Sequence, residues 1–557
     1  MNGAIDLILE QLPDEDTLFI YPSEIAASFW SRKVLSGGGP LRALRPDRFI
    51  SWDTYKEKTF DLTQEAVPAN RLIKLLFTAD LLRSNAEGEP FLKKLLIPGL
   101  SSSWRPFVRS ISRALPALGA LWLETELLAR IDTDLLADLQ EIYRHYSEFL
   151  DSHGLYEPGW QVPSETDIES HGVVFFPQVI QDYEDFGQFL AKTGLIEFDG
   201  LVRGMRSGAR SGVDDVPAQN LRAFPNAKME VESACLEILK LLETGIPAAD
   251  IAVSLTSSEG YTEELQDTAA LYDIPLLSRL GKPLAEYPAV RLYYLLAEVL
   301  SGGFSVYKLK ELFLNTAYPW KNPAVGRGLV RFGIENFGLQ NHKDSKGFRD
   351  LWDAALKKRG TPAQLDYYRS FRRAAVKILQ AATFSRLRQA VLQFNRQFLN
   401  TDSFTTAWLL PFTAALDELP SLQEASGLVP DLKIESPYSL WLMSLAERVY
   451  VTPAKGAGVS VFEYRVAAGI YPDHHFILGV SQTASSVSRR KFSFLPVTEI
   501  AASDGFENNL TDAFLRLYEH SGENVHLSYS REGFDGPHLA PEYYVAKVEK
   551  SDLLIFE

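Results

Sequence analysis

The chain has 557 residues, of which 46% are hydrophobic and 12% aromatic, a composition that supports packed cores and excludes a disordered chain. The net charge of −16 argues against a molecule that binds nucleic acid over its whole surface, and the single cysteine, Cys235, excludes an internal disulfide or a cysteine-ligated metal centre. The amino terminus lacks the pattern of a signal peptide and the longest apolar run, residues 114–123, is too short to span a membrane, so we expect a cytoplasmic protein without membrane contact.

The amino-terminal part alternates short strands and helices. The segment "LFIYPSEIAASFW" predicts a strand, a two-residue turn of Pro22 and Ser23, and a helix that Ser23 opens. The next such pair, "RFISWDTYKEKTF", predicts a strand and a helix capped by Asp53. Residues 68–155 repeat apolar positions at helical spacing. Strand patterns return in "GVVFFPQVI" and "GLIEFDG", and a loop rich in glycine and arginine is expected at residues 203–217.

The second half of the chain repeats this alternation. "KMEVESACLEILKLLETG" predicts an amphipathic helix that ends at Gly245, with Cys235 as a core residue on its apolar side. The strands "DIAVSL" and "IPLLSRL" alternate with further helices, residues 305–450 are again helical, and strands resume in "GVSVFEY", "HHFILGV" and "NVHLSYS". Because parallel strands need long crossovers between them, this order predicts two α/β units with parallel sheets, each interrupted by a helical block.

This layout resembles that of the UvrD-like helicases of superfamily one, in which two RecA-like domains each carry a helical insertion. On that resemblance the fold class is α/β, with two RecA-like parallel-sheet domains. The resemblance implies a degenerate first RecA-like domain at 1–65 and 156–225, a helical insertion at 66–155, a degenerate second RecA-like domain at 226–304 and 455–557, and a basic helical insertion at 305–454.

Three stretches of the sequence resemble one family among these helicases, AddB, which is one of the two chains of the AddAB helicase-nucleases. The run from "GIPAADIAVSL" through "LYDIPLLSRLGKPLAEYPAVRLYYLLAEVL" follows the order of the second motor domain of AddB. "AAGIYPDHHFILGV" is similar to the helicase segment Lys-Gly-Leu-Glu-Phe-x-x-Val-Phe. "NNLTDAFLRLYEHSGENVHLSYSREGFDGPHLAPEYYV" is similar to the last helicase motif and the AddB tail that follows it.

The chain departs from the helicase pattern where positive charge would stabilise phosphoryl transfer. Pro22 and Ser23 stand where the glycines and the lysine of a phosphate loop would be. Ala468, followed by Gly469, stands at the lysine of the second segment, and His520 stands near the arginine that would reach the γ-phosphate. The resemblance therefore implies a motor fold that no longer hydrolyses ATP, and we expect no catalytic residue, metal or cofactor.

Residues 305–400 have a charge opposite to that of the rest of the chain. They contain 18 Lys or Arg and 6 Asp or Glu, a net charge of +12, so the remaining residues carry −28. Cations neutralise phosphates and aromatic rings stack on unpaired bases, so we predict DNA contact, with a solvated helix face above a core of aromatic rings as the alternative. The predicted DNA-binding residues are Lys357, Lys358, Arg359, Arg369, Arg372, Arg373, Arg386 and Arg388, and the interleaved aromatic residues are Tyr367, Tyr368, Phe371 and Phe384.

Other candidate sites are set aside. AddB proteins continue into a nuclease domain with an Asp…(Asp/Glu)-x-Lys metal site and four cysteines for an iron–sulfur cluster, and we expect this chain, which stops at Glu557, to lack both. Asp431 and Lys433 in "VPDLKIES" have no flanking apolar strand. His474 and His475 are adjacent on a strand, where side chains point to opposite faces, so we expect no shared metal.

The resemblance implies a subunit similar to AddB or RecC that holds DNA in double-strand-break processing and recombinational repair. An AddA-like ATP-dependent helicase-nuclease partner in a heterodimer would supply hydrolysis, and we expect no enzymatic activity from this chain alone. Two alternatives stay open. The chain is the amino-terminal part of a PD-(D/E)XK nuclease subunit whose catalytic domain is missing or separate, or it is a protein-interaction scaffold without DNA contact.

Overall fold

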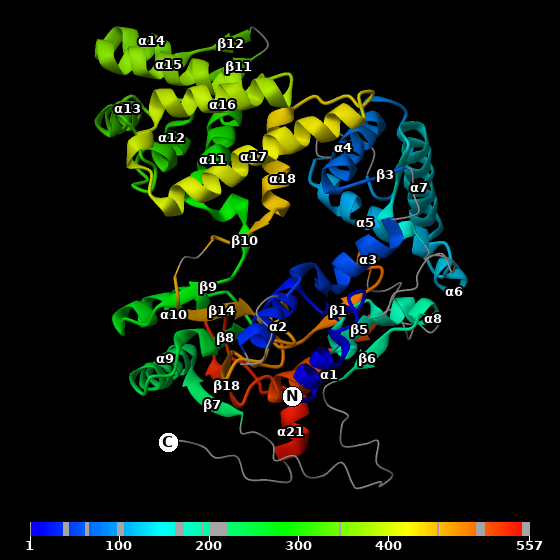
Figure 1. Cartoon of the computed structure of the whole chain (residues 1–557). Coiled ribbons are helices and arrows are strands. Elements are labelled where there is room, and N and C mark those ends of the chain that lie inside the picture. The colour runs from blue at the N-terminus through cyan, green and yellow to red at the C-terminus, as the bar shows by residue number, and fades with distance from the viewer. Residues whose placement is uncertain are drawn as a thin grey trace. The chain divides into compact units, whose positions relative to one another are not determined.

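The structure, a computed structural model, describes residues 2–36, 44–61, 66–96, 105–161, 172–190, 193–199, 221–344, 347–453, 456–496 and 507–548. The chain divides into two compact units (Figure 1). The loop expected at residues 203–217 lies outside the described residues. The α/β unit comprises Met1–Glu65, Gln161–Leu280 and Pro453–Glu557, and the helical unit comprises Ala66–Trp160 and Gly281–Thr452.

One sheet of the α/β unit has four parallel strands in the order β2-β1-β5-β6. Apolar runs that the sequence predicts as strands form it, and three of the four strands are almost wholly buried, as in a sheet covered on both faces, whereas the edge strand β6 is mostly exposed. The strands are β1 (Leu18–Tyr21), β2 (Phe49–Ser51), β5 (Gly172–Phe175) and β6 (Ile196–Phe198). The helices in this part are α1 (Asn2–Gln11), α2 (Glu24–Ser36), α3 (Trp52–Asp61) and α8 (Gly187–Leu190).

The helix after β2 begins earlier than the sequence predicts. α3 starts at Trp52, and the hydroxyl of Ser51 accepts the backbone N–H of Thr54 at 3.2 Å. A capping residue must still be extended while its side chain faces the first turn, and Ser51 satisfies this as the last residue of β2. Asp53 lies inside the first turn, so the prediction that it caps the helix is wrong.

The second sheet has six parallel strands in the order β7-β18-β15-β8-β14-β9. Its strands come from two segments far apart in the chain, which confirms the predicted α/β class with parallel sheets in a RecA-like layout. They are β7 (Arg222–Asn226), β8 (Ile251–Leu255), β9 (Leu276–Ser278), β14 (Val459–Glu463), β15 (His474–Leu478) and β18 (Asn524–Glu532). The accompanying elements are α9 (Ala227–Glu243), α10 (Tyr261–Leu271), α20 (Thr511–Glu519), α21 (Glu542–Val548) and the antiparallel pair β16 (Ser488–Arg490) and β17 (Glu507–Asn509).

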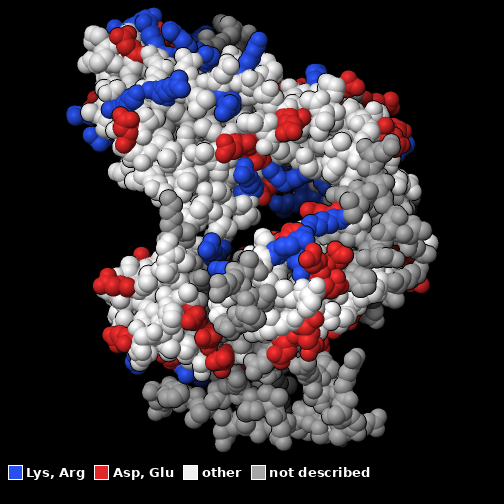
Figure 2. Space-filling view, viewed as in Figure 1, with Lys and Arg blue, Asp and Glu red and all other residues white. Residues whose placement is uncertain are grey.

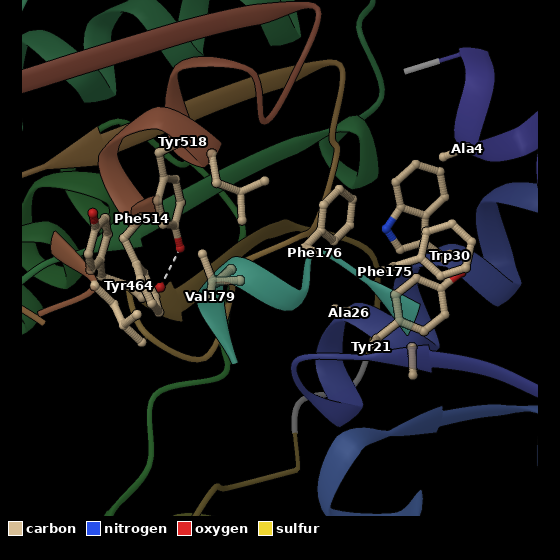
Figure 3. Packing of buried hydrophobic residues seen from close by; sticks show 14 of the residues in the cluster. Ala4, Tyr21, Ala26, Trp30, Phe175, Phe176, Val179, Tyr464, Phe514 and Tyr518 are labelled. Carbon is tan, nitrogen blue, oxygen red and sulfur yellow. Dashed lines mark hydrogen bonds between the residues drawn. The ribbon is translucent and has the colours of Figure 1, made fainter. Parts of the chain in front are cut away.

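A single apolar core joins the two sheets of the α/β unit. Its side chains come from β1, α2 and β5 on one side and from β15, α20 and β18 on the other. Aromatic rings are prominent in it (Figure 3): Tyr21 stacks on Phe175 with ring centroids 4.7 Å apart, and Tyr464 stacks on Tyr518 at 4.4 Å. Close packing of this kind makes the two halves of the unit one body.

A buried carboxylate fixes α9 against its neighbours. Glu230 accepts hydrogen bonds from the backbone N–H of Gly479 at 2.8 Å, the hydroxyl of Ser528 at 2.6 Å and the hydroxyl of Tyr261 at 2.7 Å. Burial raises the pKa of Glu230, against the opposing effect of these hydrogen bonds. Because the donors belong to different elements, the network holds α9, α10 and β18 in register.

The helical unit is formed by the two stretches that the sequence predicts as helical. The first stretch contains α4 (Arg71–Glu87), α5 (Phe107–Leu121), α6 (Thr125–Leu128) and α7 (Thr133–His153). The second stretch contains α12 (Val306–Phe313), α13 (Pro323–Glu335), α14 (Leu351–Arg359), α15 (Pro362–Leu379), α16 (Phe384–Phe398), α17 (Thr406–Leu428) and α18 (Pro437–Glu447). The helical unit also includes α11 (Pro288–Ser301), which precedes residue 305.

Short strand pairs accompany these helices. They are β3 (Val67–Pro68) with β4 (Leu155–Tyr156), β10 (Lys282–Pro283) with β13 (Val449–Tyr450), and the hairpin of β11 (His342–Asp344) and β12 (Gly347–Arg349). Of the helices in the described ranges, none combines the length and apolar character that a membrane span requires.

Candidate nucleic-acid interface

The turn between β1 and α2 stands where the helicase resemblance places a phosphate loop. The hydroxyl of Ser23 accepts the backbone N–H of Ala26 at 3.2 Å and donates to the carbonyl of Val466 at 2.7 Å. Ser23 therefore caps α2, as predicted, and ties its N-terminus to the segment between β14 and β15. Pro22 lies beside it, partly buried. A helix N-terminus commonly receives a phosphate, and here backbone from the other half of the α/β unit contacts it.

The segment with Ala468 and Gly469 packs against the same helix. Ala468 is buried, and the carbonyl of Gly469 accepts the indole N–H of Trp30 on α2 at 2.7 Å. Gly469 has a φ of +90°, and a Cβ there would lie 2.9 Å from the ring of Phe176, so both conformation and space require glycine. His520 is the C-cap of α20. Apolar packing and backbone contacts thus surround the Ser23 and Ala468 positions.

A groove of about 1070 Å³ in the helical unit is lined by residues of α15, of α16 and of the start of α14. Helical spacing puts three arginines of α15 on the face that lines it. Figure 2 shows Lys and Arg gathered over the end of the helical unit that carries these helices. Five cations and two carboxylates line the groove: Arg369, Arg372, Arg373, Lys377 and Arg386, with Asp350 and Asp353.

The two carboxylates hold two of the arginines. Arg369 Nε lies 2.5 Å from Asp353 Oδ1, and Arg372 Nη1 lies 3.1 Å from Asp350 Oδ2. The hydrogen bond from Arg369, followed by that from Lys357, lowers the pKa of Asp353 to about 2. Asp353 is therefore ionised at neutral pH, and part of the positive charge of the groove is already compensated.

The remaining arginines of the groove have no such compensation. Arg373 on α15 and Arg386 on α16 are exposed, and no carboxylate among the described residues lies within ion-pair distance of either. The third uncompensated cation, Lys377, donates to the uncharged side chain of Gln393 at 2.7 Å. An anion that enters the groove would meet these three groups without first displacing a protein carboxylate.

The structure brings four of the eight predicted DNA-binding residues into the groove and leaves the others outside its lining. Lys357 and Lys358 are exposed on the last turn of α14. Arg359 ends that helix and donates from Nη1 to Asn336 Oδ1 at 3.1 Å. Arg388 lies on α16 and lines a separate pocket of about 400 Å³ with residues of α17. The predicted set therefore divides between the groove, the end of α14 and the second pocket.

The aromatic residues predicted to stack on bases belong to the core. Tyr368, Phe371 and Phe384 are buried, and the Tyr368 hydroxyl donates to Asp350 Oδ1 at 2.9 Å. Tyr367 packs edge-on against a ring of α16. For these rings the structure therefore agrees with the alternative interpretation, a charged helix face above an aromatic core, because the apolar stripe of α15 and α16 faces the helix bundle and the charged stripe faces the groove.

Four arginines that sequence analysis did not single out surround two buried glutamates elsewhere in the helical unit. Glu447 Oε1 lies 3.4 Å from Arg109 Nε and 3.3 Å from Arg113 Nε. Glu418 Oε2 lies 2.7 Å from Arg448 Nη1. Arginines outnumber carboxylates here, and the side chain of Arg113 is 64% exposed. This arginine cluster consists of Arg71 on α4, Arg109 and Arg113 on α5, and Arg448 after α18.

A signal for the arginine cluster is present in the sequence. Arg105, Arg109 and Arg113 recur at every fourth position in "RPFVRSISR", which places the last two on one face of α5. Arg109 and Arg113 share the partner Glu447 of α18, which is more than 300 positions away in the chain, so spacing alone could not show that a carboxylate compensates part of this charge.

Comparisons with known proteins agree with the layout. Residues 5–199 match the family model described as the Treponema TP0900 N-terminal P-loop domain, and residues 285–451 match the one described as the Treponema TP0900 fourth helical domain. The chain is 27% identical over 582 residues to an uncharacterized protein of Treponema pallidum (strain Nichols), covering 93% of this chain and 71% of that protein.

A second, more distant similarity concerns a helicase-nuclease. The chain is 21% identical over 299 residues to a protein of Exiguobacterium sibiricum that is named as a subunit of an ATP-dependent helicase/deoxyribonuclease. The match covers 50% of this chain and 25% of that protein, so the matched half of this chain corresponds to about a quarter of that protein's length. The similarity to the TP0900 models is therefore accompanied by a loose link to proteins of the AddB type.

Proposed function

We propose that the chain is a non-hydrolysing, helicase-like subunit that binds DNA during double-strand-break processing and recombinational repair, in the manner of AddB or RecC. The observation that carries the proposal is the groove lined by α14, α15 and α16, where cations outnumber carboxylates and Arg373 and Arg386 have no acidic partner among the described residues. Guanidinium groups in such positions suit the phosphates of a nucleic-acid strand. The arginine cluster adds a second cationic surface to the same unit.

The α/β unit supports the non-hydrolysing part of the proposal. A P-loop domain keeps its strand-turn-helix here, but Pro22 and Ser23 replace the residues that would hold phosphate, and Ser23 bonds to the protein backbone instead. Ala468 is buried at the position of a motif lysine. ATP hydrolysis would then come from an AddA-like helicase-nuclease partner in a heterodimer, and this chain would hold and guide the DNA.

The test is salt-dependent DNA binding by a charge-reversed groove. Fluorescence anisotropy with labelled single-stranded and tailed duplex DNA is measured over a series of salt concentrations for wild type and for Arg373→Glu/Arg386→Glu. We expect the double variant to bind all sequences more weakly and its log–log salt slope to be smaller by about 1.4, since each phosphate contact on a single strand contributes about 0.7.

A matched control separates the groove from the general effect of net charge. Lys228→Glu/Lys240→Glu makes the same change in net charge on exposed positions of α9, in the α/β unit, and should keep the wild-type affinity and slope. Equal losses in both double variants would assign the binding to net charge alone and not to the groove. A wild-type chain that binds no DNA would refute the proposal and favour the interaction scaffold.

A further inference from the structure

An exposed aromatic ring stands at the turn that ends α13. Phe337 is 95% exposed, more than any other large apolar side chain among the described residues. Backbone hydrogen bonds fix the turn: the N–H of Gly338 donates to the carbonyl of Gly333 at 3.0 Å, and the N–H of Phe337 donates to that of Ile334 at 3.2 Å. The ring is therefore held in solvent on a defined support.

The backbone of this turn is unfavourable for a large side chain. Phe337 has a φ of +62° and Gly338 a φ of +70°, both in the left-handed region. Helices commonly end with glycine or asparagine in this conformation, because other side chains clash with the backbone there. Phenylalanine seldom adopts a positive φ and is usually buried, and Phe337 does neither of the usual things. An unfavourable backbone conformation that the surrounding turn holds in place is often found at functional sites.

The apolar surface around Phe337 is small. Tyr307 on α12 is 69% exposed, and a Cβ on Gly338 would lie 3.8 Å from its hydroxyl oxygen. Ile334, in the last turn of α13, is 57% exposed. Three exposed side chains are far fewer than the roughly 20 to 30 residues that each partner contributes to a stable protein interface. This small apolar surface could contact a single flat ring, but it is too small to form an interface with another protein.

Two cations lie near the turn that carries this ring. Arg359, the last residue of α14, donates to Asn336, which directly precedes Phe337, at 3.1 Å. Lys358 is exposed on the same last turn of α14. Asp353, which lines the groove, precedes Arg359 by six positions, about 9 Å along a helix axis at 1.5 Å per residue. A strand that follows this helix would therefore pass from the groove to Arg359 within a few nucleotides.

We propose that Phe337 stacks on an unpaired base of a strand whose phosphates lie in the groove lined by α14, α15 and α16. The inference rests on the proposed function and adds a preference for single-stranded segments, because bases within a duplex already stack on their neighbours. Every base has a π face, so stacking of this kind tolerates any sequence. Cations at the end of α14 would neutralise the phosphates on either side of the stacked base.

The test compares Phe337→Ala with wild type, using the full chain and anisotropy on a single-stranded oligothymidylate and a blunt duplex. Loss of one stacked base should weaken single-strand binding about 5- to 150-fold. Duplex affinity and the salt slope should stay at wild-type values, since no phosphate contact is lost. An oligothymidylate that carries 5-iodouracil at one position should photo-crosslink to the peptide that contains Phe337 in the wild type.

Two further variants separate loss of the ring from a loss of stability and from a general loss of exposed apolar surface. Phe337→Gly removes the ring and relieves the left-handed backbone, so it should lose single-strand affinity without loss of thermal stability. Leu271→Ala removes another exposed apolar side chain, on α10 of the α/β unit, and should bind as wild type. Single-strand affinity that is unchanged in Phe337→Ala, or a crosslink at another site, would overturn the stacking proposal while leaving groove binding intact. Absence of DNA binding by wild type would overturn both.

Discussion

His475 on β15 is a buried histidine that links two parts of the α/β unit. Its Nε2 lies 2.8 Å from Ser254 Oγ on β8, and its Nδ1 lies 2.7 Å from Ser521 Oγ, which follows α20. Burial lowers the pKa of His475 to about 3. Its neighbour His474 is partly exposed and has its ring centroid 6.4 Å from that of His526. The two adjacent histidines therefore have separate surroundings.

The lowered pKa of His475 predicts acid sensitivity. An unfolded histidine has a pKa of about 6.5, so below that pH the unfolded state binds the proton first and the free energy of unfolding falls by up to about 1.4 kcal/mol per pH unit towards pH 3. The stability is thus present above pH 6.5 and lost on acidification. His475→Gln should flatten this dependence between about pH 6.5 and 4.5 in urea unfolding.

The neighbouring histidine supplies the control for this prediction. His474→Gln removes an imidazole from the same strand but not from the buried network, and its stability should follow the pH as in the wild type. A wild-type pH profile in His475→Gln would show that other groups cause the acid sensitivity.

At the scale of secondary-structure elements, α15 has an apolar face and a charged face. One stripe is apolar and includes Tyr368, Phe371 and Ala375, all buried against neighbouring helices. The other is charged and lines the groove. The partner helix α14 contributes the carboxylate of Asp353, which binds Arg369 and Lys357. Helix packing therefore controls how much of the charge on α15 is available to a ligand.

Removal of the α14 carboxylate should strengthen DNA binding. Asp353→Asn frees Arg369 and Lys357, so we expect higher affinity and a salt slope that is steeper by about 0.7 for each cation that reaches a phosphate. The low pKa of Asp353, about 2, means that mild acid cannot produce the same release. Anisotropy over a salt series measures both quantities.

Asp402→Asn is the matched control, because it removes one negative charge from an exposed position of the helical unit, in the turn Thr401–Ser403, and among the described residues Asp402 forms no ion pair with a groove cation. Equal gains in both variants would mean that net charge, and not the release of Arg369 and Lys357, explains the effect. An unchanged slope in Asp353→Asn would place these two cations out of reach of the strand.

At the scale of the whole molecule, the continuous apolar core of the α/β unit leads to a prediction about ATP hydrolysis. Nucleotide hydrolysis between two RecA-like domains needs an open polar site, whereas here one apolar core extends from β1 and β5 to β15 and β18. The N-terminus of α2, where phosphate would bind, is bonded to Val466 through Ser23. Both features differ from what an open nucleotide site between two RecA-like domains requires.

The chain alone should therefore hydrolyse no ATP, with or without DNA. Phosphate release from purified protein is the measurement, in the presence of magnesium and single-stranded DNA. Turnover above about 1 s⁻¹, the low end for ordinary enzymes, that disappears when Ser23 is replaced by Ala or Ala468 by Glu would contradict the prediction. Turnover that survives both substitutions would point to a contaminating enzyme, which a further purification step removes.

The two parallel sheets follow from the order of amino acids alone. Segments such as "LFIY", "IAVSL" and "HHFIL" are β1, β8 and β15, because a strand buried on both faces is largely apolar and its parallel neighbour requires a crossover helix. The buried position of Cys235 and the positive charge of residues 305–400 are predicted in the same way. The four-part domain division and the partner subunit stay predictions.

The availability of charges and rings, in contrast, depends on the packing of the helices. Arg369 is compensated by Asp353 of another helix, and Arg109 meets Glu447, 338 positions away in the chain. Tyr368, which composition suggested for base stacking, is buried, while Phe337 is exposed at the end of α13. Residue type and spacing are local properties, whereas burial and ion pairing depend on which helices pack together, and packing joins residues that the sequence keeps far apart.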